Sequence, residues 1–143
     1  MAASDATDAA FEAHFAENFD GVRAVFENDA DPEITGRDPW VYIENESDED
    51  DQASLGAGSA SGHGDNLMRE TGRVGFYVLV PIGSGRKAAR QLRDQIVAAF
   101  AAQDIGPVTC RAAHRVSGYA WDGVHANGNW QAFPVLIDWY RDY

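Results

Sequence analysis

Two segments of the chain alternate apolar and other residues with a period of two, and this pattern constrains the fold more than any other. Apolar side chains recur at every second position, at Val74, Phe76, Val78 and Val80 and again at Phe133, Val135, Ile137 and Trp139. Successive side chains of a strand point to opposite faces, so each segment predicts a long strand with one buried face. The strands are expected over about 68–80 and 130–140, and Pro134 predicts that the second is an edge strand or carries a bulge.

Three shorter strands and two helices complete the predicted elements. Residues 22–26, 40–43 and 108–116 are rich in β-branched and aromatic residues and predict strands. Phe11, Phe15 and Phe19, spaced by four, predict an N-terminal helix, and a second apolar stripe predicts a helix from about 86 to 103. These elements predict one α+β domain over residues 1–143, with a small mixed or antiparallel sheet covered on one face by two helices.

The stretch from Ser47 to Asn66 contains almost no residue that a core could bury. It begins with a run of carboxylates, Asp48, Glu49, Asp50 and Asp51, and continues as a tract of glycine, serine and alanine. So few apolar groups cannot offset the entropy lost when a segment is ordered. We therefore predict a long loop over residues 48–66 that is mobile in the isolated subunit and partly ordered by assembly.

The charge of the chain is strongly acidic. Lysine and arginine together number 11 against 23 aspartates and glutamates, which gives a net charge of −12, and Lys87 is the one lysine. Such a surface repels phosphate backbones, which argues against nucleic-acid binding as the main activity. An Asp-rich, Lys-poor surface resembles proteins that function in concentrated salt, where screening weakens self-repulsion. An arginine-biased, GC-rich genome is the alternative explanation.

The sequence contains no pattern typical of a secreted or membrane protein. The N-terminal residues lack the basic and apolar regions of a secretory signal, and the longest apolar run, 74–82, is far shorter than a membrane span. Cys110 is the single cysteine, so no intrachain disulfide can form, and its strand-like surroundings predict a buried, unreactive thiol. These features predict a soluble chain.

No motif in the sequence predicts catalysis. Residues 80–87 resemble a phosphate-binding loop, but Ala88 stands where the metal-binding hydroxyl would be required. The run of carboxylates at 48–51 could gather a hard cation, although it lacks the spacing of a calcium loop and is better explained as solvated charge. The histidines His63, His114 and His125 show no metal-ligand spacing, and no ordered Ser-His-Asp arrangement is present. We therefore predict no enzymatic activity, no cofactor and no resident metal.

The scarce positive charge of the chain is concentrated at the start of the second predicted helix. Arg86, Lys87, Arg90 and Arg93 are four of the 11 positive charges and lie within eight residues. The three arginines are spaced by four and three and predict one exposed helical stripe. We predict that this stripe contacts carboxylates of a neighbouring subunit or of another partner protein. The alternative is that it only balances its own helix and Asp94.

Several short motifs together resemble a known family. Residues 22–28 give V-x-x-x-F-E-N, residues 52–56 give Q-x-S-L-G, and Gly128-Asn129-Trp130 opens the last strand. The most specific motif, R-x-x-G-x-x-x-[FY]-x-[LV]-x-[VT]-P-x-G-x-G, runs from Arg69 to Gly85 and leads into an alanine-rich helix. With these motifs, the chain resembles the tail terminator proteins of long-tailed phages, often grouped with the minor tail proteins, over about residues 11–142.

The resemblance implies a structural role in a virion. Proteins of this family form a ring, expected to be a hexamer, that caps the tail tube, stops its polymerisation and joins the tail to the head connector. The implied partners are further copies of the chain, the tail-tube protein and head–tail connector proteins, with DNA only in passage and no membrane. The implied location is the tail or neck of a virion assembled in the host cytoplasm, and the composition suggests a halophilic host.

Two other functions remain open at this point. The first is a head–tail connector or tail-completion subunit, whose size and fold class overlap with those of a terminator. The second belongs to another class, a small acidic module that binds a cation such as calcium. A module of this kind would stay monomeric, whereas a terminator is expected to form rings at high salt.

Overall fold

A computed structural model describes residues 4–27, 34, 36–52, 68–123 and 129–143. It contains two 14-residue helices, α1 (Asp5–Asn18) and α2 (Lys87–Phe100). The strands are β1 (Arg23–Phe26), β2 (Trp40–Gln52), β3 (Met68–Pro81), β4 (Asp104–Ile105), β5 (Val108–Arg115), β6 (Tyr119–Ala120) and β7 (Trp130–Asp142).

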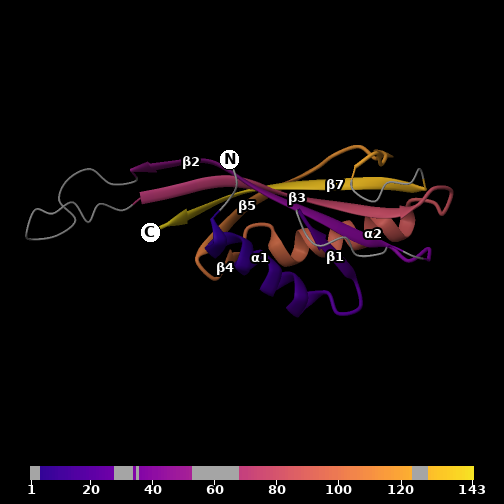
Figure 1. Ribbon diagram of the computed structural model, residues 1–143, viewed down its shortest axis with the longest axis horizontal. Helices are drawn as coiled ribbons and strands as arrows, with labels where there is room; N and C mark the ends of the chain where they lie inside the picture. Colours follow the sequence, from indigo (N-terminus) through magenta and orange to yellow (C-terminus); the bar gives the residue numbers. More distant parts are fainter. Residues whose placement is uncertain (1–3, 28–33, 35, 53–67, 124–128) are drawn as a thin grey trace, which may run out of the picture.

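The strands form one mixed sheet. Their order is β1-β2-β3-β7-β5-β4, and β6 pairs with β7 beside the end of β5. The pairing of β1 with β2 is parallel and every other pairing is antiparallel. At 3.3 Å per residue the 14 residues of β3 span about 45 Å. Figure 1 shows β2, β3 and β7 running along most of the molecule, so these three strands set its length.

The main hydrophobic core lies between one face of the sheet and the two helices. The alternating residues that predicted two long strands supply its sheet side, with Val74, Phe76 and Val78 from β3 and Val135, Ile137 and Trp139 from β7. The helices contribute apolar residues at helical spacing, namely Phe11 and Phe15 from α1 and Ala89, Ile96 and Phe100 from α2.

A second hydrophobic cluster lies on the opposite face of the sheet. It is built from aromatic and aliphatic residues at one end of the long strands: Val25, Trp40, Tyr42, Leu79, Trp121, Trp130 and Ala132. Trp121 follows β6 and packs against Tyr42 and Tyr77 at ring-centroid distances of 5.7 and 5.4 Å. Both faces of the sheet therefore bury apolar side chains at this end, although a helix contributes to one cluster only.

The predicted fold class, an α+β sandwich with one sheet face covered by two helices, is wrong. Strand residues outnumber helical residues among those described, and the mixed sheet curls into a half-barrel. The helices do not form a covering layer, because β2 and β3 continue well beyond α1 (Figure 1). The prediction failed because the acidic end of β2 has no apolar alternation, yet its backbone pairs with β3 up to Gln52.

The predicted loop over 48–66 is wrong for its first residues. Asp48, Glu49, Asp50 and Asp51 lie in β2, where Asp50 is opposite Glu70 and Asp51 is opposite Arg69. A register shift between Ser47 and Glu49 marks a bulge at the start of this acidic segment. Residues 53–66 of the predicted loop lie outside the described residues. Ladder hydrogen bonds satisfy the backbone of an acidic strand as well as that of an apolar one, and composition alone does not reveal them.

The edge position or bulge predicted for Pro134 is also wrong, because β7 lies between β3 and β5 and its pairing with β3 keeps a regular register through Pro134. On its outer side β7 pairs with β6 at 131–132 and with β5 from 135 onward, so Pro134 lies between the two partners. Its carbonyl accepts a hydrogen bond from the Val116 N–H at 3.0 Å. The nitrogen of a strand residue faces the same side as its carbonyl, so the missing N–H interrupts no strand pairing there.

A buried polar network attaches the start of α1 to the sheet. Glu70, which is 2% exposed, accepts hydrogen bonds from the Ser4 N–H at 3.1 Å, the Ser4 hydroxyl at 2.9 Å and Arg141 Nε at 3.1 Å. Beside it, the Asn45 amide accepts from Trp139 Nε1 and donates to Asp8, both at 2.8 Å. These contacts orient the first turn of α1 over β2, β3 and β7.

Replacing Glu70 by glutamine is expected to lower the free energy of unfolding by about 2 kcal/mol. The variant keeps the shape of the side chain but leaves the nearly buried Arg141 guanidinium without its carboxylate. Urea unfolding at constant ionic strength measures the change, with Glu46→Gln, an exposed position on β2, as the control. Equal effects of the two substitutions would contradict a stabilising role for the network.

Candidate functional site: an arginine-lined groove

A tight turn places the start of α2 beside the end of β3. Gly83 and Gly85 have positive φ angles of 87° and 85°, which favour glycine, and the Ser84 hydroxyl donates to the Pro81 carbonyl at 2.6 Å. Arg86 is the N-cap residue of α2, its side chain makes no capping bond, and the first turn contains no acidic residue. The positive end of the helix dipole therefore adds to the positive charge of Arg86 and Lys87.

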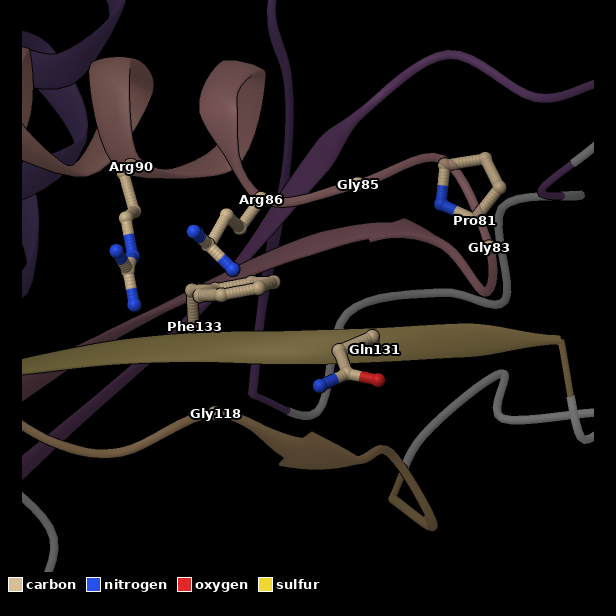
Figure 2. A pocket seen from close by; sticks show the side chains of 8 residues that line it. All are labelled: Pro81, Gly83, Gly85, Arg86, Arg90, Gly118, Gln131 and Phe133. Atoms are coloured by element: carbon tan, nitrogen blue, oxygen red, sulfur yellow. The ribbon is translucent and has the colours of Figure 1, made fainter.

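A groove of about 540 Å³ lies between this helix end and the beginning of β7. Figure 2 shows Arg86 and Arg90 reaching from α2 toward the Phe133 ring on β7, with Gln131 further along the same strand. The residues that line the groove are Pro81, Gly83, Gly85, Arg86, Arg90, Gly118, Gln131 and Phe133. The groove thus has guanidinium groups on one wall and an aromatic ring at its floor.

A second hollow of about 190 Å³ continues the first along α2. It shares Arg90, Gly118 and Phe133 with the first and adds Arg93 from α2 and Arg115 from the end of β5. We call the two hollows together the arginine groove, defined by Arg86, Arg90, Arg93 and Arg115. Four guanidinium groups of an otherwise acidic chain therefore converge on one surface depression.

Arg93 is buried, and the predicted exposed stripe is wrong at this position. Its side chain is 9% exposed, its terminal nitrogen donates to the Val116 carbonyl at 3.0 Å, and its Nε is buried without a hydrogen-bond partner in the structure. Burial lowers the pKa of Arg93, and the nearby charges of Arg115 and Arg90 lower it further. The spacing that joins Arg93 to Arg90 equally joins it to Ala89 and Ile96, which belong to the buried side of α2.

The other charged residues of the cluster are exposed. Arg86, Lys87 and Arg90 lie on the surface, and Lys87 is outside the residues that line the groove. Asp94, the predicted balancing carboxylate, pairs instead with Arg115 at 3.0 Å. Within the described part of the chain, Arg86 and Arg90 form no ion pair. Their charges are therefore available to an anionic partner.

Replacing Arg93 by glutamate is expected to lower the free energy of unfolding by about 2–3 kcal/mol, because a carboxylate would be buried beside the carbonyls of Val116 and Pro134. The matched substitution Arg90→Glu, at an exposed position on the same helix, is expected to change it by less than about 0.5 kcal/mol. Urea unfolding compares the two variants. Equal stability of both would show that the Arg93 environment accepts either charge.

The remaining candidate groups do not assemble into a site. The acidic residues of β2 lie at the other end of the sheet, His114 is exposed and 3.9 Å from Asp138, and His63 and His125 lie outside the described residues. The described residues contain no group of three or more side chains arranged to hold a metal ion, and none of their helices is long and apolar enough to cross a membrane. Burial and the charge of Asp104 raise the pKa of the Cys110 thiol to about 12, which opposes thiolate chemistry.

The sequence predicted the residues on one wall of the groove but not those on the other. Arg86 and Arg90 were predicted from their local clustering, whereas Arg115, Gln131 and Phe133 come from β5 and β7. Arg115 carries no signal of its own, because it ends an ordinary strand. Its approach to α2 depends on the pairing of β5 with β7, which no local pattern specifies.

Comparison with known proteins shows the fold and nothing of the function. No family model matches the chain, and no curated protein matches it. Several solved structures are similar, and one of them has a TM-score of 0.54 and 14% identity over 95% of this chain and 96% of that chain. The same overall fold is thus present in another protein of nearly equal extent.

Proposed function

We propose that the chain is a structural subunit of a virus tail, a tail terminator that forms a ring on the end of the tail tube. In this role the ring stops tube polymerisation and joins the tail to the head connector, and the genome passes through its lumen. The motif from Arg69 to Gly85 supplies the resemblance, and the distribution of charge along the molecule supports assembly.

The observation that carries the proposal is the separation of opposite charges along the sheet. The acidic end of β2 lies beside the start of β3, since Gln52 is opposite Met68, whereas the arginine groove begins at Pro81, where β3 ends. The far end of the acidic strand is therefore about 45 Å from Pro81, the length of β3, and Glu46, opposite Arg73, lies about 26 Å from Pro81 along the strand. Figure 1 shows the end of β2 and the turn before α2 at opposite ends of the molecule.

Two different, complementary surfaces on one subunit favour head-to-tail association. Such a heterologous contact repeats from subunit to subunit, and it generates a ring when the rotation between neighbours closes. A two-fold dimer would instead require one surface that is complementary to itself. The charge distribution of this chain therefore fits a ring or a filament better than a symmetric dimer.

The net charge of −12 is also compatible with this role. A negatively charged lumen repels the phosphate backbone of DNA and so allows the genome to pass without binding. Concentrated salt would screen the long-range repulsion between acidic subunits, and it screens ion pairs that become buried in a contact much less.

Tube assembly in the presence of the chain tests the proposed function. The tail-tube protein of the same virus is polymerised in molar salt with and without the chain, and tube lengths are measured by electron microscopy. We expect shorter tubes with an extra ring at one end when the chain is present, and the same result for Lys87→Gln, which lies outside the groove. Unchanged lengths and bare tube ends at an excess of the chain would contradict the proposal.

A further inference from the structure

We propose that the arginine groove binds the acidic strand of a second copy of this chain, with the carboxylates around Glu46 and Asp48 of one subunit contacting Arg86 and Arg90 of the next. The inference rests on the proposed ring and identifies the contact that builds it. The ligand of the groove is thus an extended acidic peptide segment, and it is part of the same protein.

Among the described residues, Asp94 is the one carboxylate that pairs with a guanidinium group of the arginine groove. Arg86 and Arg90 are exposed and form no ion pair among the described residues, and Arg115 shares its positive charge with Asp94 alone. Arg93 adds a buried guanidinium group. Its Nε has no hydrogen-bond partner, and Arg93 forms no ion pair with any described residue. A carboxylate in the groove would accept charge-assisted hydrogen bonds from planar guanidinium donors, a geometry in which bidentate pairing is common.

The acidic end of β2 carries more carboxylates than the nearby arginines can pair with. The arginines of the adjacent strand form their ion pairs with β7, Arg69 with Asp142 at 2.6 Å and Arg73 with Asp138 at 2.8 Å. Arg73 also lies opposite Glu46. The hydrogen bond to Asp138 raises the pKa of Arg73 and the charge of Asp48 raises it further, so this one arginine serves several carboxylates. Glu46 and Asp48 are exposed, and no described ion pair includes either. A guanidinium group from a neighbouring subunit would neutralise them.

Crowding of carboxylates along β2 supports the same conclusion. Burial raises the pKa of Glu44, and the adjacent Glu46 and Glu27 raise it further. Neighbouring carboxylates disfavour one another's charged form, and a cation from outside the cluster stabilises that form. The acidic strand therefore gains from the contact as the groove does.

The acidic segment of β2 is exposed where the contact is proposed. Glu46 and Asp48 flank the register shift between Ser47 and Glu49, a bulge that interrupts the regular alternation of the strand. Among the described residues, β1 pairs with the outer edge of β2 at Trp40–Ile43 only. Beyond Ile43, the Asn45 N–H is occupied by the Glu27 carboxylate at 2.9 Å. An exposed, extended strand can thus enter an open groove.

Charge reversal on each side of the contact provides the test. One variant carries Arg86→Glu and Arg90→Glu, and the other carries Glu46→Arg and Asp48→Arg; all four positions are exposed, so both variants are expected to fold. Sedimentation velocity should show at least a tenfold weaker self-association of each variant than of the wild type. Lys87→Glu, a charge reversal beside the groove, is expected to assemble like the wild type.

Mixing the two variants makes the test specific. Each reversed groove then meets a reversed strand, so an equimolar mixture is expected to regain assemblies in which the two variants alternate. Rings of wild-type stability from the groove variant alone would overturn the assigned contact while leaving the proposed ring intact. Failure of the mixture to assemble would also overturn the assigned contact. The same holds if the main effect of the groove variant is a loss of binding to a fluorescent DNA oligonucleotide. Absence of rings from the wild type would instead count against the proposed function.

Discussion

Replacing Phe100 by alanine is expected to lower the free energy of unfolding by about 4 kcal/mol, the range measured for large cavities in close-packed cores. Phe100 ends α2 and is fully buried. Its ring lies 4.6 Å from that of Phe76 on β3 and 4.8 Å from the His14 imidazole on α1, measured between centroids. It also approaches the rings of Phe11, Phe15 and Phe19 within 6.5 Å. The substitution therefore removes a side chain that joins both helices to the sheet.

An exposed aromatic residue provides the control for this cavity. Tyr119 on β6 is 40% exposed, and Tyr119→Ala is expected to cost less than about 1 kcal/mol. Urea unfolding followed by tryptophan fluorescence measures both variants. If Phe100→Ala lowered the free energy of unfolding no more than Tyr119→Ala does, the described packing of the helices against the sheet would be contradicted.

Replacing Gly72 by valine is expected to destabilise the protein by about 4 kcal/mol, at the upper end of the range for overpacked sites. Gly72 lies in the middle of three long strands, and a Cβ atom there would overlap both the Glu46 carbonyl oxygen on β2 and the Trp139 ring on β7. The backbone of β2 would have to move away, which would break its pairing with β3.

The neighbouring position separates this clash from a general effect of valine in the strand. Thr71→Val keeps a β-branched residue on the same strand and is expected to change stability by less than about 1 kcal/mol. Thermal unfolding of both variants at constant salt tests the difference. A tolerated Gly72→Val would contradict the close packing of Trp139 against β3.

The sequence predicted the elements whose residues repeat a simple period. The alternation from Val74 to Val80 and from Phe133 to Trp139 gave β3 and β7, and the phenylalanines spaced by four gave α1. The acidic end of β2 was missed because exposed carboxylates carry no β-sheet signal, and the two-residue strands β4 and β6 are too short to show a period. Because these strands were missed, the strand content was underestimated and the fold class was predicted wrongly.

Only those residues of the candidate site that lie close together in the sequence were predicted. Arg86 and Arg90 lie one helical turn apart, so their clustering is visible in the sequence and survives in the groove. Arg93 was placed on the wrong side of α2, because its spacing fits the exposed residues and the buried ones equally well. The groove exists because β7 and the end of β5 bring Gln131, Phe133 and Arg115 to the helix, and such long-range pairing leaves no local pattern.

The mass of the wild-type assembly in molar salt tests the central claim, that the chain forms a ring through head-to-tail contacts. Multi-angle light scattering should give a closed species of uniform mass, near six times the 15.6 kDa of the chain if the ring is the expected hexamer. A species of 15.6 kDa at every protein concentration, or a two-fold dimer that grows no further, would contradict the account.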